Sequence, residues 1–189
     1  VADGRRGGLD LTADVDAEPI LARKLYAALA RMGLTQWPAT PLEGHFDAWL
    51  DTSWTFLESF GVARRDGSRL EAMQPVDEAA IDGAWAALSV SHPKYAEHNR
   101  LVDSVFVALE SIVRGRRLAT EILFPDASMD ALKSVYKGND KSDLYNAIVH
   151  ASALAFVESA AACGRQVRIL EIGAGTGGTS DGLLRGLER

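Results

Sequence analysis

The segment VRILEIGAGTGGTS, residues 167–180, decides the fold class of this 189-residue chain. It opens with Val167–Ile172, which is apolar on both faces, as the central strands of parallel sheets are. A glycine-rich turn and the start of a helix follow at once, and Gly173, Gly175 and Gly178 satisfy the pattern G-x-G-x-x-G. A strand before this pattern and a helix after it are what a nucleotide-type site requires. The segment therefore predicts the first strand and helix of an α/β core, with a ligand at the turn.

The residues around the turn discriminate among three kinds of ligand. A phosphate-binding loop needs lysine at the position of Thr179, so a nucleoside triphosphate site is excluded. A dinucleotide site would place a diphosphate at the turn, where the carboxylate of Glu171, two residues before Gly173, is unfavourable. The same acid suits a ligand that carries an ammonium or sulfonium group. The sequence therefore favours a ligand with a positive charge.

The spacing E-x-G-x-G-x-G resembles the start of the S-adenosylmethionine site of class I methyltransferases. Glycines at this turn let the backbone approach a ligand, and the following helix offers free N–H groups. The resemblance implies S-adenosylmethionine as the cofactor. The cofactor-binding residues that it implies are Glu171, Gly173, Ala174, Gly175, Thr176 and Gly177.

A longer stretch, from about Val113 to Gly182, resembles the methyltransferase domains embedded in modular polyketide synthases. The sequence ATEILFPDASMDALKSVYKGNDKSDLYNAIV is similar to the region that precedes the cofactor motif in those domains. It has an LFP element, a short helix, a Tyr-x-x-Asn turn and a D-x-x-N helix. The matching positions are Leu123, Phe124, Pro125, Tyr136, Gly138, Asn139, Asp143, Tyr145 and Asn146. Residues 1–75 match the family only in general shape.

This resemblance implies a helical lid over a Rossmann-like core and an acyl substrate tethered to an acyl carrier protein. Most such domains methylate the α-carbon of a β-ketoacyl thioester, which is the favoured activity here, and others methylate a β-hydroxyl oxygen. In the carbon-methylating kind, a histidine–glutamate pair downstream of the cofactor motif supplies the base, so catalytic residues are not assigned in this chain. His150 lies in the middle of a helix and is interpreted as structural. A further alternative is a non-catalytic remnant that serves docking or spacing.

Four polar residues upstream of the turn are candidates for the lid or substrate pocket. Their hydroxyl and amide groups suit the lining of a cofactor or acyl pocket. The same residues could instead form a local turn and a helix cap, and the family resemblance favours the pocket. These residues are Tyr136, Asn139, Tyr145 and Asn146.

Residues 1–16 are predicted to be a linker, and residues 17–75 a winged-helix-like module. Pro19 is expected at the first position of a helix that ends at Gly33, and a second helix is expected over about Glu43–Phe60. A hairpin on an Asp-Gly turn is predicted from Val62 to Met73. We favour a packing module over a DNA-binding one. The second helix carries only acidic charges, which DNA phosphates would repel: Glu43, Asp47, Asp51 and Glu58.

Residues 76–166 are predicted to be a helical lid, and residues 167–189 the start of the Rossmann-like core. Helices are expected over about 77–90, 94–113, 128–137 and 141–163, with RRLATEILFPD as a connector and Ser128 as a helix cap. No other segment has the character of a buried strand. We therefore expect Val167–Ile172 to lack a ladder partner within this chain.

Composition excludes several classes of protein. The net charge of −6 and a pI of about 5.2 argue against nucleic acid as a partner. No apolar run reaches the ~20 residues that a membrane-spanning helix needs. The one cysteine, Cys163, cannot form an intrachain disulfide, which favours a cytoplasmic location. The histidines, among them His45, His92 and His98, show no metal-ligand spacing, so no metal is expected.

The chain begins without methionine and stops within a recognisable motif, so we interpret it as part of a larger synthase. The acid that binds the ribose hydroxyls lies ~20 residues past the glycines in such sites. That position falls beyond Arg189. We therefore expect the 189-residue chain to be inactive alone and to need the remainder of the synthase chain.

Overall fold

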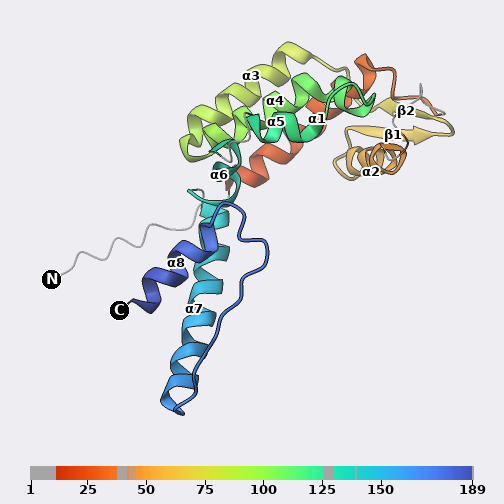
Figure 1. The fold of residues 1–189 in the computed structure, drawn as a ribbon. Coiled ribbons are helices and arrows are strands. Elements are labelled where there is room, and N and C mark those ends of the chain that lie inside the picture. Colours follow the sequence, from red (N-terminus) through yellow and green to blue (C-terminus); the bar gives the residue numbers. More distant parts are fainter. Residues whose placement is uncertain are drawn as a thin grey trace. The chain divides into compact units, whose positions relative to one another are not determined.

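The structure of the chain is a computed structural model that describes residues 12–37, 42, 44, 46–125, 130–138 and 140–188 (Figure 1). The chain divides into two compact units, which we call the N-terminal unit (Thr12–Ser128) and the C-terminal unit (Met129–Arg189). The N-terminal unit holds α1 Thr12–Arg31, α2 Phe46–Ser59, β1 Ala63–Asp66, β2 Arg69–Ala72, α3 Glu78–Ser91, the 3-10 turn Pro93–Tyr95, α4 Ala96–Val113 and α5 Ala119–Leu123. The C-terminal unit holds α6 Asp130–Tyr136, α7 Asp140–Ala162 and α8 Gly178–Leu187.

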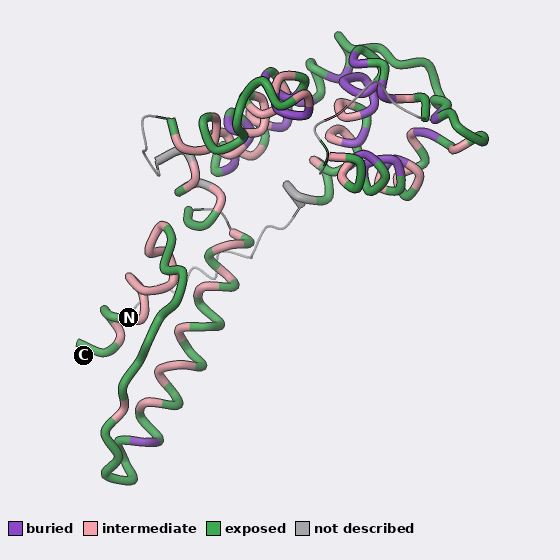
Figure 2. The backbone as a smooth tube through the Cα atoms, turned by 45° about the vertical axis from the view of Figure 1, so that its right-hand side comes forward, coloured by how far each residue is buried: buried purple, intermediate pink, exposed green. Residues whose placement is uncertain are grey.

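The N-terminal unit is built around one hydrophobic core. Its largest fully buried side chains come from α1, the following turn, α2 and α4, and are Leu29, Leu34, Leu50, Leu57 and Val113. Figure 2 shows these elements as the main purple region of the chain. Because Val113 of α4 shares a core with α1 and α2, the predicted boundary at residue 76 does not coincide with a packing boundary. The predicted domain limits otherwise stay a prediction.

The predicted hairpin is confirmed, with a shift of one residue in its loop. β1 and β2 pair antiparallel from Ala63 opposite Ala72 to Asp66 opposite Arg69, which leaves Gly67 and Ser68 as the loop. Gly67 has φ of 56°, a left-handed conformation that side chains disfavour.

A third strand-like segment, which the sequence analysis did not predict, lies beside β2. The Leu70 N–H donates to the Thr35 carbonyl at 2.9 Å, and a bridge joins Gln36 to Arg69. The hairpin of the helix–helix–hairpin arrangement is thereby joined to the segment after α1 by an isolated bridge.

The predicted start of the first helix is wrong. α1 begins at Thr12 and carries Pro19 inside it, whereas the sequence analysis placed Pro19 at its first position. This part of α1 lies against α3, since Ala17 and Glu18 line one small cavity together with Trp85 of that helix. The predicted linker therefore becomes helix from Thr12 onward, and residues 1–11 lie outside the described residues.

Other predicted elements agree with the structure to within a few residues. Asp77 caps α3 as a side-chain acceptor for the Ala80 N–H at 3.0 Å. Gly33, Gly61 and Gly164 follow α1, α2 and α7, and all have positive φ. The predicted connector contains a short helix, α5. Of the remaining predictions, Glu43, His45 and the Ser128 cap lie outside the described residues.

The predicted strand Val167–Ile172 is wrong as an element, because the structure has irregular chain there. A strand needs a neighbour to pair with, and the only ladder among the described residues joins β1 to β2. The segment is instead open to solvent, with Leu170 84% and Ile172 89% exposed. This agrees with the expectation that the segment has no ladder partner within the part of the chain that the structure describes.

Candidate cofactor-binding site

The glycine turn before α8 has a backbone that favours glycine at alternate positions. Gly173, Gly175 and Gly177 have φ of 76°, 54° and 71°, all in the left-handed region. The Gly177 N–H donates to the Ala174 carbonyl at 2.9 Å and closes the turn, and Gly177 is the N-cap of α8. A side chain at Gly175 would not be excluded by lack of space, since its Cβ would lie 3.7 Å from the Gly173 oxygen. The sequence-predicted glycines are therefore required by backbone conformation.

Glu171 lies just before this turn, and its carboxylate is held by the first turn of α8. The Ser180 hydroxyl donates a hydrogen bond to Glu171 Oε2. The positive end of the α8 dipole favours a negative charge at this place. The structure thus brings the predicted acid beside the predicted glycines, at the end of a helix with free N–H groups.

Two of the predicted pocket residues meet the start of α8. Asn146 on α7 donates through Nδ2 to the Tyr136 carbonyl at 3.0 Å and accepts at Oδ1 from the Thr179 hydroxyl at 2.9 Å. A Cβ on Gly178 would lie 3.1 Å from the same Tyr136 oxygen, so the end of α6 packs closely on the first residue of α8. The sequence analysis considered Thr179 only as the position where a phosphate loop has lysine. Asn146 and His150 are four positions apart and therefore lie on one face of α7. That spacing does not predict which residues of α8 this face contacts.

The other two pocket candidates, Tyr145 and Asn139, and the side chain of Tyr136 are placed differently. Tyr145 is 60% exposed, and the side chain of Tyr136 is 55% exposed, so both are open to a ligand. Asn139 lies outside the described residues. The structure therefore brings Tyr136 and Asn146 together through the Tyr136 backbone and places the ring of Tyr145 at the surface.

His150 is a half-buried structural residue, as interpreted from its place in the helix. Its Nε2 lies 2.6 Å from the Thr179 carbonyl oxygen, and its ring lies next to Gly182. A Cβ at Gly182 would lie 2.0 Å from the ring, and one at Gly186 would lie 2.6 Å from Leu154. Glycine at Gly182 therefore leaves room for the His150 ring between α7 and α8, whereas at Gly186 a shift of the flexible Leu154 side chain could make room for a Cβ.

An ion pair also joins α6 to the first turn of α8. Lys137 Nζ lies 2.7 Å from Asp181 Oδ2, and Arg185 contacts the same carboxylate. The Lys137 hydrogen bond holds the pKa of Asp181 below its ordinary value, although partial burial acts in the opposite direction. Asp181 is therefore ionised at neutral pH.

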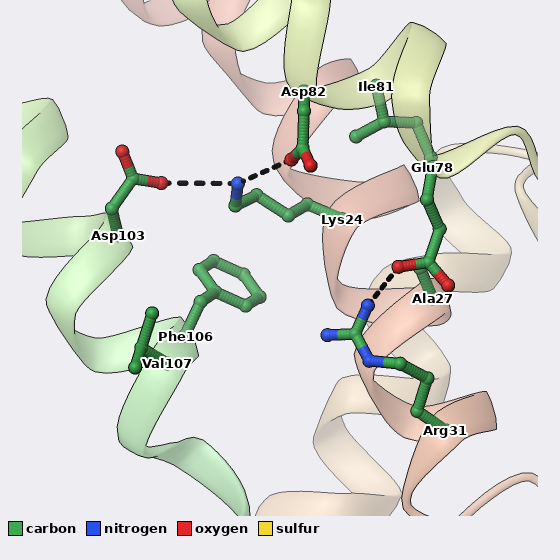
Figure 3. Close-up of a pocket in the computed structure, with 9 residues that line it drawn as sticks. All are labelled: Lys24, Ala27, Arg31, Glu78, Ile81, Asp82, Asp103, Phe106 and Val107. Carbon is green, nitrogen blue, oxygen red and sulfur yellow. Dashed lines mark hydrogen bonds and ion pairs between the residues drawn. The ribbon is translucent and has the colours of Figure 1, made fainter.

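The N-terminal unit has its own charged cluster, shown in Figure 3. Lys24 Nζ lies 3.0 Å from Asp82 and 3.1 Å from Asp103, beside a cavity of about 250 Å³. Burial alone would lower the pKa of Lys24, but its hydrogen bonds and ion pairs with the two aspartates outweigh burial and raise it. A second pair, Arg31 with Glu78, lies at the same crossing of helices. Each of these charges has a partner within the cluster, so the cluster joins α1, α3 and α4.

The winged-helix-like module keeps its charges internal in the same way. Arg65 of β1 lies 2.7 Å from Asp51 and 3.1 Å from Glu58, both on α2. Its guanidinium also lies over the Trp54 ring at 5.4 Å. Arg65, one of the three arginines of the hairpin, is thereby neutralised by the acidic helix, whereas Arg64 pairs within the hairpin with Glu71 at 3.9 Å.

Metal and membrane features are not found in the described ranges. Among the described residues, no three histidine, cysteine, aspartate or glutamate side chains lie where they could share a metal ion. In the same part of the chain, no helix is both long and apolar enough to span a bilayer.

The chain is similar in sequence to short parts of large polyketide synthases. No family model matches it. Polyketide synthase ThaQ of Burkholderia thailandensis is 36% identical over 146 residues, which is 74% of this chain and 7% of that protein. Polyketide synthase PksR of Bacillus subtilis is 29% identical over 184 residues, which is 92% of this chain and 7% of that protein.

The solved structures that resemble this chain are carbon methyltransferases. The DszA carbon methyltransferase matches with a TM-score of 0.77 and 29% identity, over 94% of this chain and 49% of that chain. The CMeT domain of the citrinin polyketide synthase matches with a TM-score of 0.73 and 18% identity, over 98% of this chain and 50% of that chain, which shows a shared fold. The chain thus spans about half the length of the solved domains that it matches.

Proposed function

Because this chain belongs to the methyltransferase domains of polyketide synthases, we propose that the full-length protein carrying it methylates a polyketide intermediate. The methyl donor is S-adenosylmethionine, and the acceptor is the α-carbon of an acyl chain held by an acyl carrier protein. Similarity to the DszA carbon methyltransferase supports carbon over oxygen as the acceptor. A cytoplasmic location belongs to the same proposal and rests on the single cysteine.

The observation that carries the proposal is the glycine turn with a carboxylate beside it. When bound, S-adenosylmethionine supplies an electrophilic methyl group on a positively charged sulfur. The chain fits that group because the left-handed glycines project no side chains into the turn, and Glu171 adds a negative charge next to it. We assign cofactor binding to Glu171, Gly173, Ala174, Gly175, Thr176 and Gly177.

The pocket residues follow from the same proposal. The exposed rings of Tyr136 and Tyr145 are available to contact the cofactor or the acyl chain, and Asn139 is retained as a third candidate. The acyl carrier protein and the remainder of the synthase are the proposed partners.

The test compares two glycine-to-valine variants of the full-length protein by calorimetry with S-adenosylmethionine. Gly175→Val should abolish binding, because valine disfavours left-handed backbone and would put a branched side chain where the backbone must approach the ligand. Gly164→Val is the matched control: Gly164 has φ of 67° and open space around it, so it carries the same strain away from the turn. Equal affinity for Gly175→Val and wild type would move the cofactor site elsewhere.

A second measurement identifies the acceptor atom. The full-length protein is incubated with labelled S-adenosylmethionine and a β-ketoacyl carrier protein, and the product is analysed by NMR. A methyl group on the α-carbon is the expected result. A methyl ether would overturn carbon methylation, and a protein that neither binds nor transfers would be a non-catalytic remnant.

A further inference from the structure

We infer that Asn146 and Thr179 are positioning residues for the cofactor turn: they fix its place through α8 without contacting the cofactor. This inference rests on the proposed function of the glycine turn. It differs from the pocket role that the sequence favoured for Asn146. It also gives Thr179 a role, which the sequence analysis did not.

The carboxamide of Asn146 connects two elements and is engaged at both ends. Its Nδ2 donates to the Tyr136 carbonyl at 3.0 Å, and its Oδ1 accepts from the Thr179 hydroxyl at 2.9 Å. Tyr136 is the last residue of α6, and Thr179 is the second residue of α8. One side chain on α7 therefore ties the end of α6 to the beginning of α8.

The glycines of the turn have no side chains that could anchor it to the rest of the domain. Its three left-handed glycines have no side chains, and its closing hydrogen bond, from Gly177 to Ala174, is internal. The turn runs directly into Gly178, so its position depends on where α8 begins. Glu171 depends on α8 as well, because its carboxylate is held by the Ser180 hydroxyl.

Two further contacts hold the first turn of α8. The Thr179 carbonyl lies 2.6 Å from His150 Nε2, and Asp181 pairs with Lys137 at 2.7 Å. Thr179 is thus held through both its backbone oxygen and its hydroxyl. A binding turn that is fixed before the ligand arrives loses less conformational freedom on binding, which raises affinity.

The test measures cofactor affinity, acyl-substrate KM and melting temperature in variants of the full-length protein. Asn146→Ala and Thr179→Val should each weaken S-adenosylmethionine binding about tenfold, which corresponds to about 1.4 kcal/mol. Thr179→Ser restores the hydroxyl and should restore affinity. The double variant Asn146→Ala/Thr179→Val should bind about as weakly as Asn146→Ala alone, because Asn146→Ala already removes the contact that Thr179→Val removes.

The control is Ser152→Ala, which removes a hydroxyl on the same helix that bonds only to the Ile148 carbonyl of α7 itself. It should leave cofactor affinity unchanged. If Asn146→Ala does not fold, the nearly isosteric Thr179→Val carries the test.

The outcomes separate this inference from the proposed function. A lower melting temperature with unchanged cofactor affinity would make the contact purely structural and overturn the inference. A raised acyl KM with unchanged cofactor affinity would restore the pocket role of Asn146. If Gly175→Val also binds normally, the proposed function fails; if only Gly175→Val loses binding, the function stands and the positioning role falls.

Discussion

The two compact units of this chain differ in what they bury. The N-terminal unit encloses leucines from α1 and α2 whose side chains are fully buried, whereas Ala160 is the only buried residue among the described residues of the C-terminal unit. The residues proposed to bind the cofactor all lie in the C-terminal unit. The comparison teaches that hydrophobic stability and ligand chemistry are located in different parts of the chain.

Helix patterning explains this difference. α2 places Leu50, Trp54 and Leu57 on one face, which packs into the core. α7 is apolar on several faces at once, and α8 covers only the face that carries His150 and Leu154. Ile148 and Phe156 of α7 therefore remain 52% and 61% exposed.

The largest expected effect is on the core of the N-terminal unit. Leu57→Ala should lower the free energy of unfolding by about 2–5 kcal/mol, because Leu57 is fully buried and a cavity would remain. Leu184→Ala in α8, where the side chain is 59% exposed, should change it by less than about 0.5 kcal/mol. Urea denaturation followed by circular dichroism measures both, and equal losses would erase the contrast between the units.

A smaller effect should appear at high pH in the N-terminal unit. The pKa of folded Lys24 lies above its ordinary value of 10.5, so its ion pairs with Asp82 and Asp103 stabilise the fold fully below that pH. The stabilisation is lost as the pH rises through the raised pKa, and should amount to about 0.2–1 kcal/mol for a partly exposed pair. Lys24→Met should flatten this part of the stability–pH curve. Identical curves for the two proteins would contradict the prediction.

The smallest effect concerns Asp181 in the C-terminal unit. Its pKa lies below the ordinary value of 3.8, so its ion pair contributes above that pH and is lost as the pH falls through the lowered pKa. NMR titration of the Asp181 carboxyl carbon should show the low midpoint. Lys137→Met should move the midpoint upward, because Lys137 is the main cause of the shift. A midpoint that does not respond to this substitution would remove Lys137 as the cause.

Local signals in the sequence predicted most of the elements, and the fold class is confirmed by the solved carbon methyltransferases. The Asp77 cap, the Gly67 turn and the glycines before α8 were predictable because each is determined by its own few residues. The early start of α1 was not predictable, since Pro19 indicates a helix start and no local signal in the sequence encodes the packing of α1 against α3.

In the candidate site, too, the features determined by neighbouring residues were predictable, and those determined by contacts between helices were not. The glycine turn was predicted from its spacing, and the role proposed for Glu171 came from its charge and from the resemblance of E-x-G-x-G-x-G to class I methyltransferases. The hydrogen bond from the Thr179 hydroxyl to Asn146 Oδ1 joins residues 33 positions apart, and no helical periodicity encodes which residue of α8 faces α7. Gly182 was likewise missed, because the need for glycine there comes from the His150 ring.

Unpaired backbone beside exposed aliphatic side chains acts as a template for self-association. Residues 167–172 combine valine, isoleucine and leucine with one arginine and one glutamate, so the segment has no net charge and no proline. Its length of about six residues and its composition match the segments that stack into cross-β aggregates. The 189-residue chain, handled at high concentration, will therefore tend to aggregate through this segment, and a lysine in place of Ile172 is the substitution that should keep it in solution.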